Sequence, residues 1–194
     1  MGTDNKRPII SMIAAVDDEW NLAIDGKLPW QSQLADKRYY LEKIAGHTII
    51  MGSTTFGAAD HSRKGNHIVV ISKRSYKEFG LPEVDVINSI GAIPTVKLLS
   101  GEEEVFITGG SSIYMAVEDE IVDRIYLNII HTGKSRTGKN VKFPRLDIKN
   151  KWNGIHSMKN FITPEGGEAF LKVMNAKFGT QLGPDDIPAL GIRV

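Results

Sequence analysis

The sequence predicts an α/β protein with a mixed, mostly parallel central sheet and flanking helices. Three observations support this fold class: six apolar, β-branched runs of strand length, helical segments between most of them, and turn residues at their boundaries. The runs are almost continuously apolar, which is typical of strands buried on both faces of a sheet. They cover residues 9–16, 48–51, 68–71, 84–87, 105–107 and 125–130.

Four helices are expected between these strands. Their predicted ranges are residues 33–45, 54–59, 94–99 and 111–118. In the third helix Pro94 suits the first turn, and in the fourth Ser111 suits the N-cap.

The pattern changes after Trp152. Two extended segments, residues 154–161 and 168–178, are separated by a Gly- and Pro-containing turn, which predicts an antiparallel C-terminal hairpin at the sheet edge. Residues 1–7 are expected to form a flexible tail and residues 179–194 an irregular one. The whole chain, residues 1–194, is therefore predicted to form a single domain.

Composition narrows the function classes. The chain has 194 residues, 41% of them hydrophobic and 24% charged, with a formal net charge of +1. No basic stripe would follow a phosphate backbone, so nucleic acid is not expected as a partner. No apolar run is long enough to span a membrane, and we expect a cytoplasmic monomer.

Metal and disulfide chemistry are not expected. The sequence has no cysteine, which excludes disulfides and thiolate ligands. The five histidines lack the spacing of metal ligands, and no Ser/His/Asp arrangement is visible. These histidines are His47, His61, His67, His131 and His156.

Asp36 is the first candidate for chemistry. It follows the long connection of residues 17–30, which is either a lid or binding loop or an irregular crossover. On a helical wheel Leu34, Leu41 and Ala45 share one side while Asp36, Tyr40 and Lys43 share another, which allows a solvated Asp36. The alternative places its carboxylate at the mouth of an aromatic cleft with Trp30, Tyr39 and Tyr40, where it would bind a planar cation or an amidine-like edge.

Two glycine-containing turns are candidates for a nucleotide site. Gly109 and Gly110 lie between a strand and a helix, and Gly52 precedes a hydroxyl-rich helix start. Such turns allow backbone approach and suit phosphate, although a tight turn alone would also explain the glycine pair. Together they indicate a dinucleotide. Lys73 and Arg74 would then bind the extra phosphate of NADPH, or form a solvated turn.

These pieces, taken in order, resemble the dihydrofolate reductase family over roughly residues 9–178. The resemblance is carried by Leu28-Pro29-Trp30 followed by Asp36 and Tyr40, by Ile50-Met51-Gly52 with Thr55-Phe56, and by Gly109-Gly110 with Ile113-Tyr114. Further matching segments are Ile13 to Val16, Ile68 to Ser72 and Ile125 to Leu127.

The resemblance implies reduction of 7,8-dihydrofolate to 5,6,7,8-tetrahydrofolate by hydride transfer from NADPH to the protonated pterin ring. Asp36 would orient the ring and favour its protonation, and Trp30 and Asn128 complete the implied catalytic set. The implied substrate residues are Ile13, Ala14, Leu28, Asp36, Lys37, Tyr40, Ala59, Arg63, Asn66, Thr108 and Tyr114. The implied cofactor residues are Ala15, Leu22, Ser53, Thr54, Thr55, Ser72, Lys73, Arg74, Thr108, Gly109, Gly110, Ser111, Ser112, Ile113 and Tyr114. Residues 17–27 would form the lid over the nicotinamide.

The sequence departs from the family mainly on the substrate side. Asn66 replaces the arginine that grips the glutamate carboxylate of folate, so Arg63, Lys64 or Lys37 would have to supply the cation. Asn128 replaces a threonine that bonds the catalytic acid, and an amide can also donate to that acid. The other departures are Thr108, Ser53 and Ala23, in place of an aliphatic residue, an arginine and a glycine.

Three alternatives follow from these departures. The first is a reductase of a related pterin, and the second is a reductase of a riboflavin precursor, against which the Trp30–Asp36 spacing argues. The third is a non-catalytic nucleotide-binding protein with the same fold, which the substitutions at Lys37, Asn66 and Thr108 keep open.

Overall fold

The computed structural model describes residues 7–30, 33–58, 65–73, 84–95, 102–117, 121–133, 137–144, 157–162, 171–172, 175–176, 179 and 181. The chain divides into two compact units, each assembled from three segments. Unit 1 comprises Met1–Ile13, Leu41–Tyr126 and Pro144–His156. Unit 2 comprises Ala14–Tyr40, Leu127–Phe143 and Ser157–Val194.

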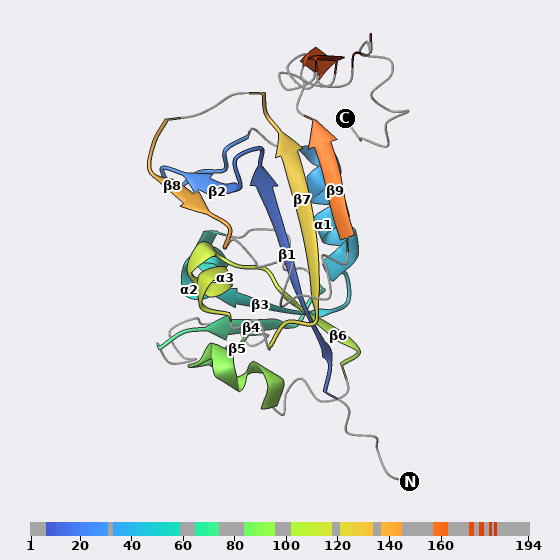
Figure 1. The fold of residues 1–194 in the computed structure, drawn as a ribbon. Coiled ribbons are helices and arrows are strands. Elements are labelled where there is room, and N and C mark those ends of the chain that lie inside the picture. The colour runs from blue at the N-terminus through green and yellow to red at the C-terminus, as the bar shows by residue number, and fades with distance from the viewer. Residues whose placement is uncertain are drawn as a thin grey trace. The chain divides into compact units, whose positions relative to one another are not determined.

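Unit 1 is built on parallel strands that bond in the order β5-β4-β3-β6-β1 (Figure 1). The strands are β1 (Ile9–Asp17), β3 (Thr48–Gly52), β4 (Ile68–Ile71), β5 (Val84–Ile87) and β6 (Glu104–Ile107). In the register, Ile50 lies opposite Val69 on one side and Ile107 on the other. The predicted mostly parallel sheet is therefore confirmed.

The strand interiors form the core of unit 1. Ile10, Ile49, Ile50, Val69 and Val105 have no exposed surface. Side chains from both faces of these strands are buried, as the continuous apolar runs indicate, because β-branched residues pack well on a pleated surface. Burying each such side chain contributes about 1.5–3 kcal/mol.

Short helices follow two of these strands. Helix α2 (Ser53–Ala58) follows β3, and α3 (Ser111–Ala116) follows β6. The predicted serine N-cap of α3 is wrong: Gly110 is the N-cap, and no side chain caps the helix. Ser111 instead takes the first helical position, because the backbone of Gly110 is still extended.

The helix predicted at residues 94–99 is wrong in its start and type. The structure has a 3-10 helix, η3 (Ile90–Thr95), that ends shortly after Pro94, and residues 96–99 lie outside the described residues. The turn already begins where the Ala92 amide donates to the carbonyl of Ser89 (3.3 Å), and Ile93 is its buried anchor. Pro94 therefore lies in the last turn of this 3-10 helix and not in its first turn.

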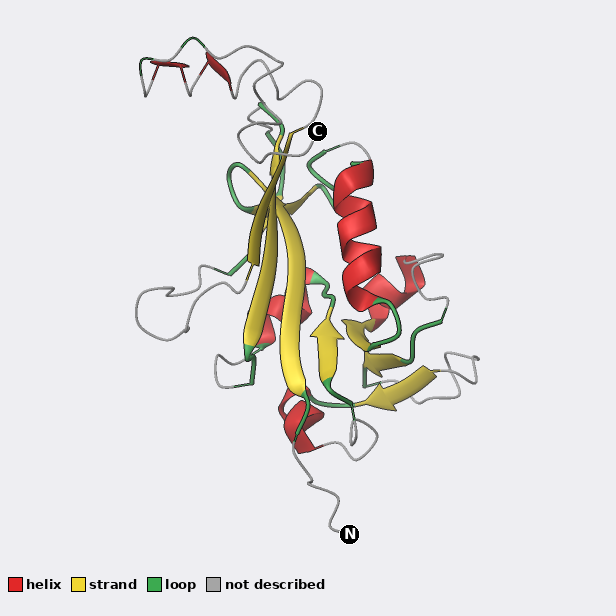
Figure 2. Ribbon diagram, turned by 90° about the vertical axis from the view of Figure 1, so that its right-hand side faces the viewer, coloured by secondary structure: helices red, strands yellow, loops and turns green. Residues whose placement is uncertain are grey.

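Unit 2 contains the first part of helix α1 (Leu34–Ile44), the second part of β1, most of β7 (Arg124–His131) and β9 (Ser157–Ile162). The hydrogen-bonded order continues from β1 through β7 to β9 at the edge. Figure 2 shows α1 as the long helix beside the extended strands. The predicted edge position of the first C-terminal segment is therefore confirmed.

The second strand of the predicted C-terminal hairpin is wrong where the structure describes it. Residues 171–172 and 175–176 are helical, and the rest of residues 168–178 lies outside the described residues. The segment Glu168-Ala-Phe-Leu-Lys-Val-Met-Asn-Ala-Lys contains one β-branched residue and several strong helix formers, so its intrinsic preference favours helix.

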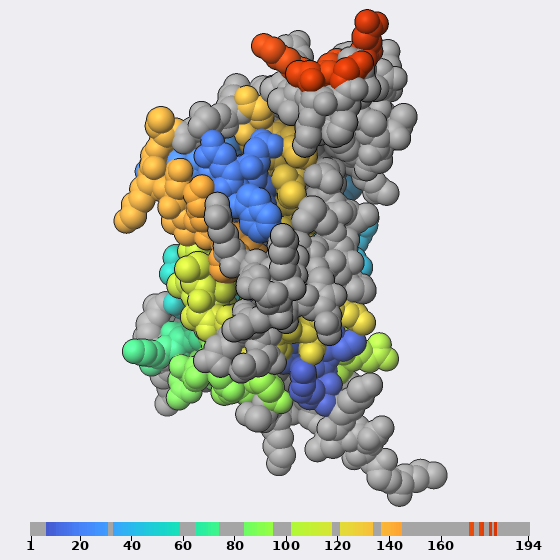
Figure 3. All heavy atoms as spheres, viewed as in Figure 1, coloured from blue at the N-terminus to red at the C-terminus, as the bar shows by residue number. Residues whose placement is uncertain are grey.

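A two-stranded antiparallel sheet was not predicted from the sequence. Strand β2 (Asn21–Ile24), which lies inside the connection of residues 17–30, pairs with β8 (Asn140–Lys142), for which no strand was predicted. Figure 3 shows the two strands together on one surface of unit 2, in blue and orange. Strands of four and three residues, interrupted by an irregularity between Asn21 and Ala23, are too short to show an alternating pattern in sequence.

Candidate active site

Asp36 lies in the first turn of α1 and is partly buried. Its Oδ1 accepts a hydrogen bond of 2.7 Å from Nδ2 of Asn128, which lies on β7 and is 2% exposed. Both residues belong to unit 2. The structure thus brings together two of the three predicted catalytic residues.

The predicted faces of α1 are partly wrong. Leu34 is 71% exposed and Ala45 is exposed, although both were assigned to the apolar side. The inward stripe is instead Asp36, Tyr40 and Ile44, spaced four residues apart, with Ile44 fully buried at 1% exposure. The solvated interpretation of Asp36 therefore does not hold.

Burial raises the pKa of Asp36 above its ordinary value, and the hydrogen bond from Asn128 acts in the opposite direction. Removal from water disfavours the charged carboxylate, whereas an N–H donor favours it. A single donor does not replace the lost hydration. The Asn128 hydrogen bond fixes the position of the carboxylate but offsets only part of the cost of burying its charge. Functional carboxylates typically lie in such environments.

Trp30, the third predicted catalytic residue, is 6% exposed. It packs in a cluster with Ile130, Ala15, Ala35 and Tyr39, all in unit 2. Ala35 and Tyr39 lie on either side of Asp36 in the sequence of α1, so the indole ring packs against the same helix that carries the acid. The predicted neighbourhood of Trp30, Tyr39 and Asp36 is present.

The other predicted substrate residues have varied surroundings. Ile13 and Ala14 lie on β1 with 3% and 7% exposure, and Leu28 is 60% exposed. Lys37 is exposed on α1, while Ala59 and Arg63 lie outside the described residues. Among the described members of this predicted set, exposed Lys37 is the one cation that could bind a carboxylate.

Asn66 has a structural position. It is 9% exposed, and its Nδ2 donates to the carbonyl oxygens of Ile44 and His47, the latter at 2.9 Å. Ile44 is the last residue of α1, and its carbonyl oxygen also accepts from the His47 amide (3.0 Å), so Asn66 adds a second donor at the end of the helix. Asn66 is therefore engaged with the backbone of unit 1.

Most of the predicted cofactor residues follow β3 or β6 in unit 1. Gly109 has φ +98°, and a Cβ there would lie 2.9 Å from the ring of Tyr114. A Cβ on Gly110 would lie 2.7 Å from Oγ1 of Thr55. The glycine pair thus brings the starts of α2 and α3 close together, and Gly52 N donates to Gly109 O at 2.7 Å.

Tyr114 and Thr108 connect this turn to neighbouring strands. The Tyr114 hydroxyl donates to the carbonyl of Ile13 (2.6 Å), inside the protein. Thr108 N donates to the carbonyl of Ile50 (2.8 Å). These bonds hold the Gly109-Gly110 turn against β1 and β3.

Hydroxyl groups surround the same turn. Ser53, Thr54 and Thr55 form the start of α2, and Ser111 and Ser112 form the start of α3, where Ile113 is buried against Gly52. Ser72 and exposed Lys73 follow β4, and Arg74 lies outside the described residues. Leu22 is partly buried on β2 in unit 2.

Hydrogen bonds that were not predicted from the sequence hold the connection from β1 to α1 in place. Buried Asp17 accepts hydrogen bonds from the amides of Glu19 and Asn21 and from Nδ2 of Asn21, at 2.8–2.9 Å. A pair of adjacent aspartates directly after a strand is the available signal, because Asp side chains commonly bond the backbone of a following turn.

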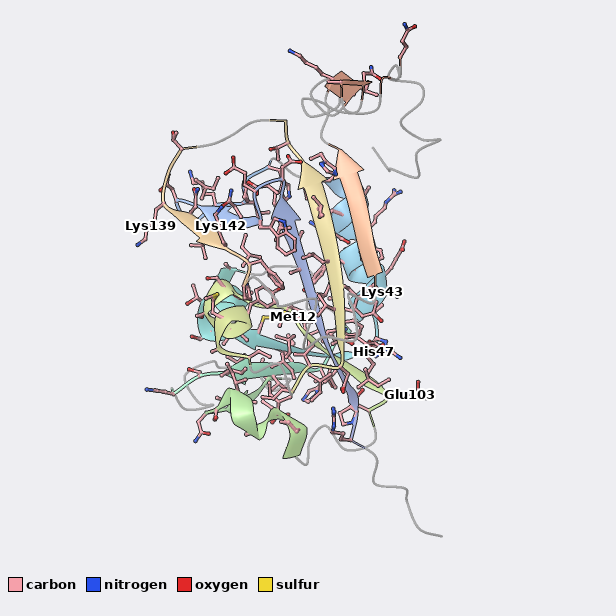
Figure 4. The ribbon with its side chains drawn as sticks, in the orientation of Figure 1. Met12, Lys43, His47, Glu103, Lys139 and Lys142 are labelled. Carbon is pink, nitrogen blue, oxygen red and sulfur yellow. The ribbon has the colours of Figure 1, made fainter. Side chains whose placement is uncertain are left out.

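Three more hydrogen bonds hold this connection to the end of β7 and to β8. Asp18 accepts from His131 Nδ1 (2.6 Å) and from the Thr132 amide (2.8 Å). These hydrogen bonds hold the pKa of Asp18 below its ordinary value, although burial acts in the opposite direction. Lys142, which extends from β8 in Figure 4, donates to the carbonyl of Glu19 (3.1 Å).

Metal-binding clusters and membrane spans would indicate other function classes. Among the described residues, no group of three or more His, Asp or Glu side chains is arranged to hold a metal ion. Within the same part of the chain, no helix is long and apolar enough to cross a membrane.

The fold and site define an α/β protein whose candidate residues follow central strands and occupy the first helix. A sequence profile of the family described as dihydrofolate reductase matches residues 9–165. The chain is 30% identical to "Dihydrofolate reductase" of Staphylococcus haemolyticus over 122 residues, covering 63% of this chain and 70% of that protein. It is 32% identical to the protein of the same name from Bacillus subtilis over 124 residues, with 63% and 70% coverage. The chain belongs to the dihydrofolate reductase family.

Proposed function

We propose that the protein reduces 7,8-dihydrofolate, or a related dihydropterin, to the tetrahydro form, with NADPH as the hydride donor. The observation that carries this proposal is the partly buried Asp36, bonded to Asn128 and next to the Trp30 cluster. Family membership supports the class of reaction. Reduction of a pterin ring needs a carboxylate that binds and orients the ring, and partly buried Asp36 on α1 is a carboxylate of the kind found at functional sites.

The role of Asp36 follows from its hydrogen-bonding capacity. An ionised carboxylate accepts two parallel hydrogen bonds from the ring N–H and the exocyclic amino group of a pterin. This contact orients the ring and stabilises positive charge on it, so the imine nitrogen accepts a proton from water more readily. One proton at that nitrogen and one hydride at the adjacent carbon complete the reduction.

The groups of unit 1 fit a phosphate-bearing cofactor. The hydroxyls of Ser53, Thr55 and Ser111 and the backbone amide of partly buried Gly110 are groups that can donate to phosphate oxygens. When bound, the reduced nicotinamide supplies the hydride. Exposed Lys73 suits the additional phosphate that distinguishes NADPH from NADH.

The position of Asn66 favours a substrate without a glutamate tail. This amide is buried and donates to the carbonyls of Ile44 and His47, so it is not available as a carboxylate clamp, and it carries no positive charge. We therefore expect dihydrofolate to saturate the enzyme poorly, and a tail-less dihydropterin to be reduced at a comparable kcat.

The test compares wild type with Asp36→Asn, using NADPH oxidation with dihydrofolate, a tail-less dihydropterin and a riboflavin precursor. We expect Asp36→Asn to lower turnover near neutral pH by at least about 100-fold, a typical loss for a proton-transfer group. Activity of the variant should rise as the pH falls, because solvent then protonates the imine directly. NADPH binding should be nearly unchanged.

Glu42→Gln is the matched control, since Glu42 is an exposed acid on the same helix. This variant should retain wild-type turnover with all accepted substrates. Full activity of Asp36→Asn would assign the chemistry to another group. Binding of NADPH without turnover of any of the three substrates would identify a non-catalytic protein, and turnover of the riboflavin precursor alone would identify the other reductase class.

A further inference from the structure

Four side chains form a hydrogen-bonded chain across the starts of four neighbouring strands in unit 1. Asp85 Oδ2 lies 2.7 Å from Nε2 of His67, and His67 Nδ1 lies 3.1 Å from Oγ1 of Thr48. The Thr48 hydroxyl donates to Oε1 of Glu102 at 2.9 Å. These residues lie on β5, just before β4, at the start of β3 and shortly before β6, in that order, so each link joins adjacent strands. The chain lies at the opposite end of these strands from the turns that carry the predicted cofactor residues.

The donor and acceptor roles in this chain are fixed by its two ends. An ionised carboxylate only accepts, so Glu102 takes the single hydroxyl proton of Thr48, and Asp85 takes a proton from Nε2 of His67. Thr48 Oγ1 then has no proton to give to Nδ1 of His67 and must accept one from it. His67 therefore donates from both ring nitrogens, which is possible only in the imidazolium form.

The charged groups around His67 suit this form. Asp85 and Glu102, both negative, are the charged side chains bonded into the chain among the described residues. Within the same residues no lysine or arginine forms an ion pair with either of them. His47 lies nearby, but its Nδ1 is directed at the carbonyl oxygen of Glu104 (3.1 Å). The positive charge of the imidazolium therefore faces two carboxylates and no competing cation in the described part of the chain.

We infer that His67 is a proton-operated switch that directs the Thr48 hydroxyl either to Glu102 or to His67 itself. When His67 loses a proton to solvent, Asp85 still requires a donor, so Nε2 keeps its proton and Nδ1 becomes an acceptor. The Thr48 hydroxyl then turns to Nδ1, and Glu102 loses its donor. The side chain of His67 is 35% exposed and exchanges protons with water, whereas the responding Thr48 is 1% exposed.

The switch acts on the segment that leads into a central strand. Glu102 is partly buried, and the carbonyl of Glu103 accepts from the amide of Ile9 at the start of β1 (2.9 Å). The strand that follows, β6, lies between β3 and β1. Histidine side chains ordinarily change charge between about pH 5 and 8. The side-chain contact that holds Glu102 to β3 is therefore present in mild acid and lost in mild alkali.

The experiment is an NMR titration of the whole chain without ligands, with ¹⁵N-labelled imidazole and ¹³C-labelled carboxyl groups, from about pH 5 to 9. In wild type the neutral form of His67 should be the Nε2–H tautomer. The carboxyl carbon of Glu102 should show a step at the same pH as the deprotonation of His67. Thr48→Val should lose this step because valine has no hydroxyl, and Thr48→Ser should restore it. The carboxyl carbon of Asp85 is the internal control, and it should keep its step in every variant.

Two results would overturn the inference. A neutral His67 that carries its proton on Nδ1 would leave the Thr48 hydroxyl on Glu102, so no switching would occur. A Glu102 step of equal size in Thr48→Val would show that this carboxylate senses the charge of His67 through space. The tautomer is measured in wild type alone, so the inference remains testable if Thr48→Val does not fold. No substrate or cofactor takes part in these measurements, so their failure would leave the proposed function unaffected.

Discussion

Burying the carboxyl group of Asp36 lowers the stability of the fold when that group is ionised, although the proposed function needs the ionised form. Burial raises the pKa of this carboxyl in the folded protein. Between its ordinary pKa and its raised folded value, the native state binds more protons than the unfolded state, so stability decreases as the pH rises through this window. The ionised Asp36 therefore destabilises the fold near neutral pH, because its charge is solvated better in the unfolded chain than in the folded one.

We predict that Asp36→Asn is more stable than wild type at neutral pH while losing turnover. The amide has no charge to desolvate, and its carbonyl oxygen still accepts from Asn128 Nδ2. The stability difference should shrink toward about pH 3, below the ordinary Asp pKa of about 3.9, where the wild-type acid is protonated in both states. Urea unfolding of both proteins across this range measures the difference.

Glu42→Gln again provides the control, and its stability should follow that of wild type at each pH. A destabilised Asp36→Asn at neutral pH would contradict this expectation, since it would mean that ionised Asp36 contributes favourably to folding.

Sequence reasoning identified Asp36 but not the reason for its burial. Its position after Pro29-Trp30 and before two tyrosines is visible in the sequence. Its inward direction is not, because Leu34 and Leu41 suggest a different apolar face, and only packing decides that Leu34 stays 71% exposed. The buried Oδ1 of Asn128, which has no hydrogen-bond partner within the described residues, could not be predicted either, since its position depends on a contact across 92 positions of sequence.

At the scale of elements, strands were predictable because each carries its own apolar signal. The six predicted strands all appear within one or two residues of their expected bounds. Elements that depend on a partner were not predictable. β2 and β8 have only four and three residues, too few to show a strand pattern of their own, and they pair through Ala23 and Val141 in the small sheet. Tertiary pairing overrides weak local preference in such cases.

The close approach of α2 and α3 gives a prediction at this scale. Gly110 has φ −73°, which any residue tolerates, so the obstacle to a side chain there is contact with Thr55 Oγ1 at 2.7 Å. Gly110→Ala should destabilise the protein by about 1–3 kcal/mol, the usual cost of overpacking. Thr55→Ala should recover most of this loss in the double variant, because it removes the contacting oxygen.

Gly57→Ala is the matched control for this cycle. Gly57 lies on α2, and no atom is within 4 Å of the position that its Cβ would take. This substitution should stabilise by about 0.5–1 kcal/mol through the helix preference of alanine. Denaturant unfolding of all the variants measures these changes. Additive losses from Gly110→Ala and Thr55→Ala would show that the two residues do not compete for this space.

At the scale of the whole molecule, the division into two units was not visible in the sequence. β1, β7 and α1 each contribute residues to both units. Each of these elements has one uninterrupted local pattern, and the boundary depends on contacts between segments far apart in the chain. Local periodicity carries no information about such contacts.

Cofactor binding is expected to change the stability of the whole chain. A ligand that binds only the native state stabilises it by RT ln(1 + [L]/Kd), about 2.7 kcal/mol at a concentration 100 times Kd. NADPH should therefore raise the Tm of the protein, and NADH at the same concentration should raise it less, because NADH gives Lys73 no additional phosphate to bind. Lys73→Ala should reduce the difference between the two cofactors, whereas Asp36→Asn should retain the full NADPH effect, because we propose that Asp36 binds the substrate and not the cofactor. Thermal unfolding with each cofactor measures these changes, with Lys139→Ala, a change of an exposed lysine on the loop before β8, as the charge-matched control.

An equal rise in Tm with NADPH and NADH in wild type would contradict the role assigned to Lys73. Loss of the NADPH-induced rise in Asp36→Asn would show that cofactor binding depends on Asp36.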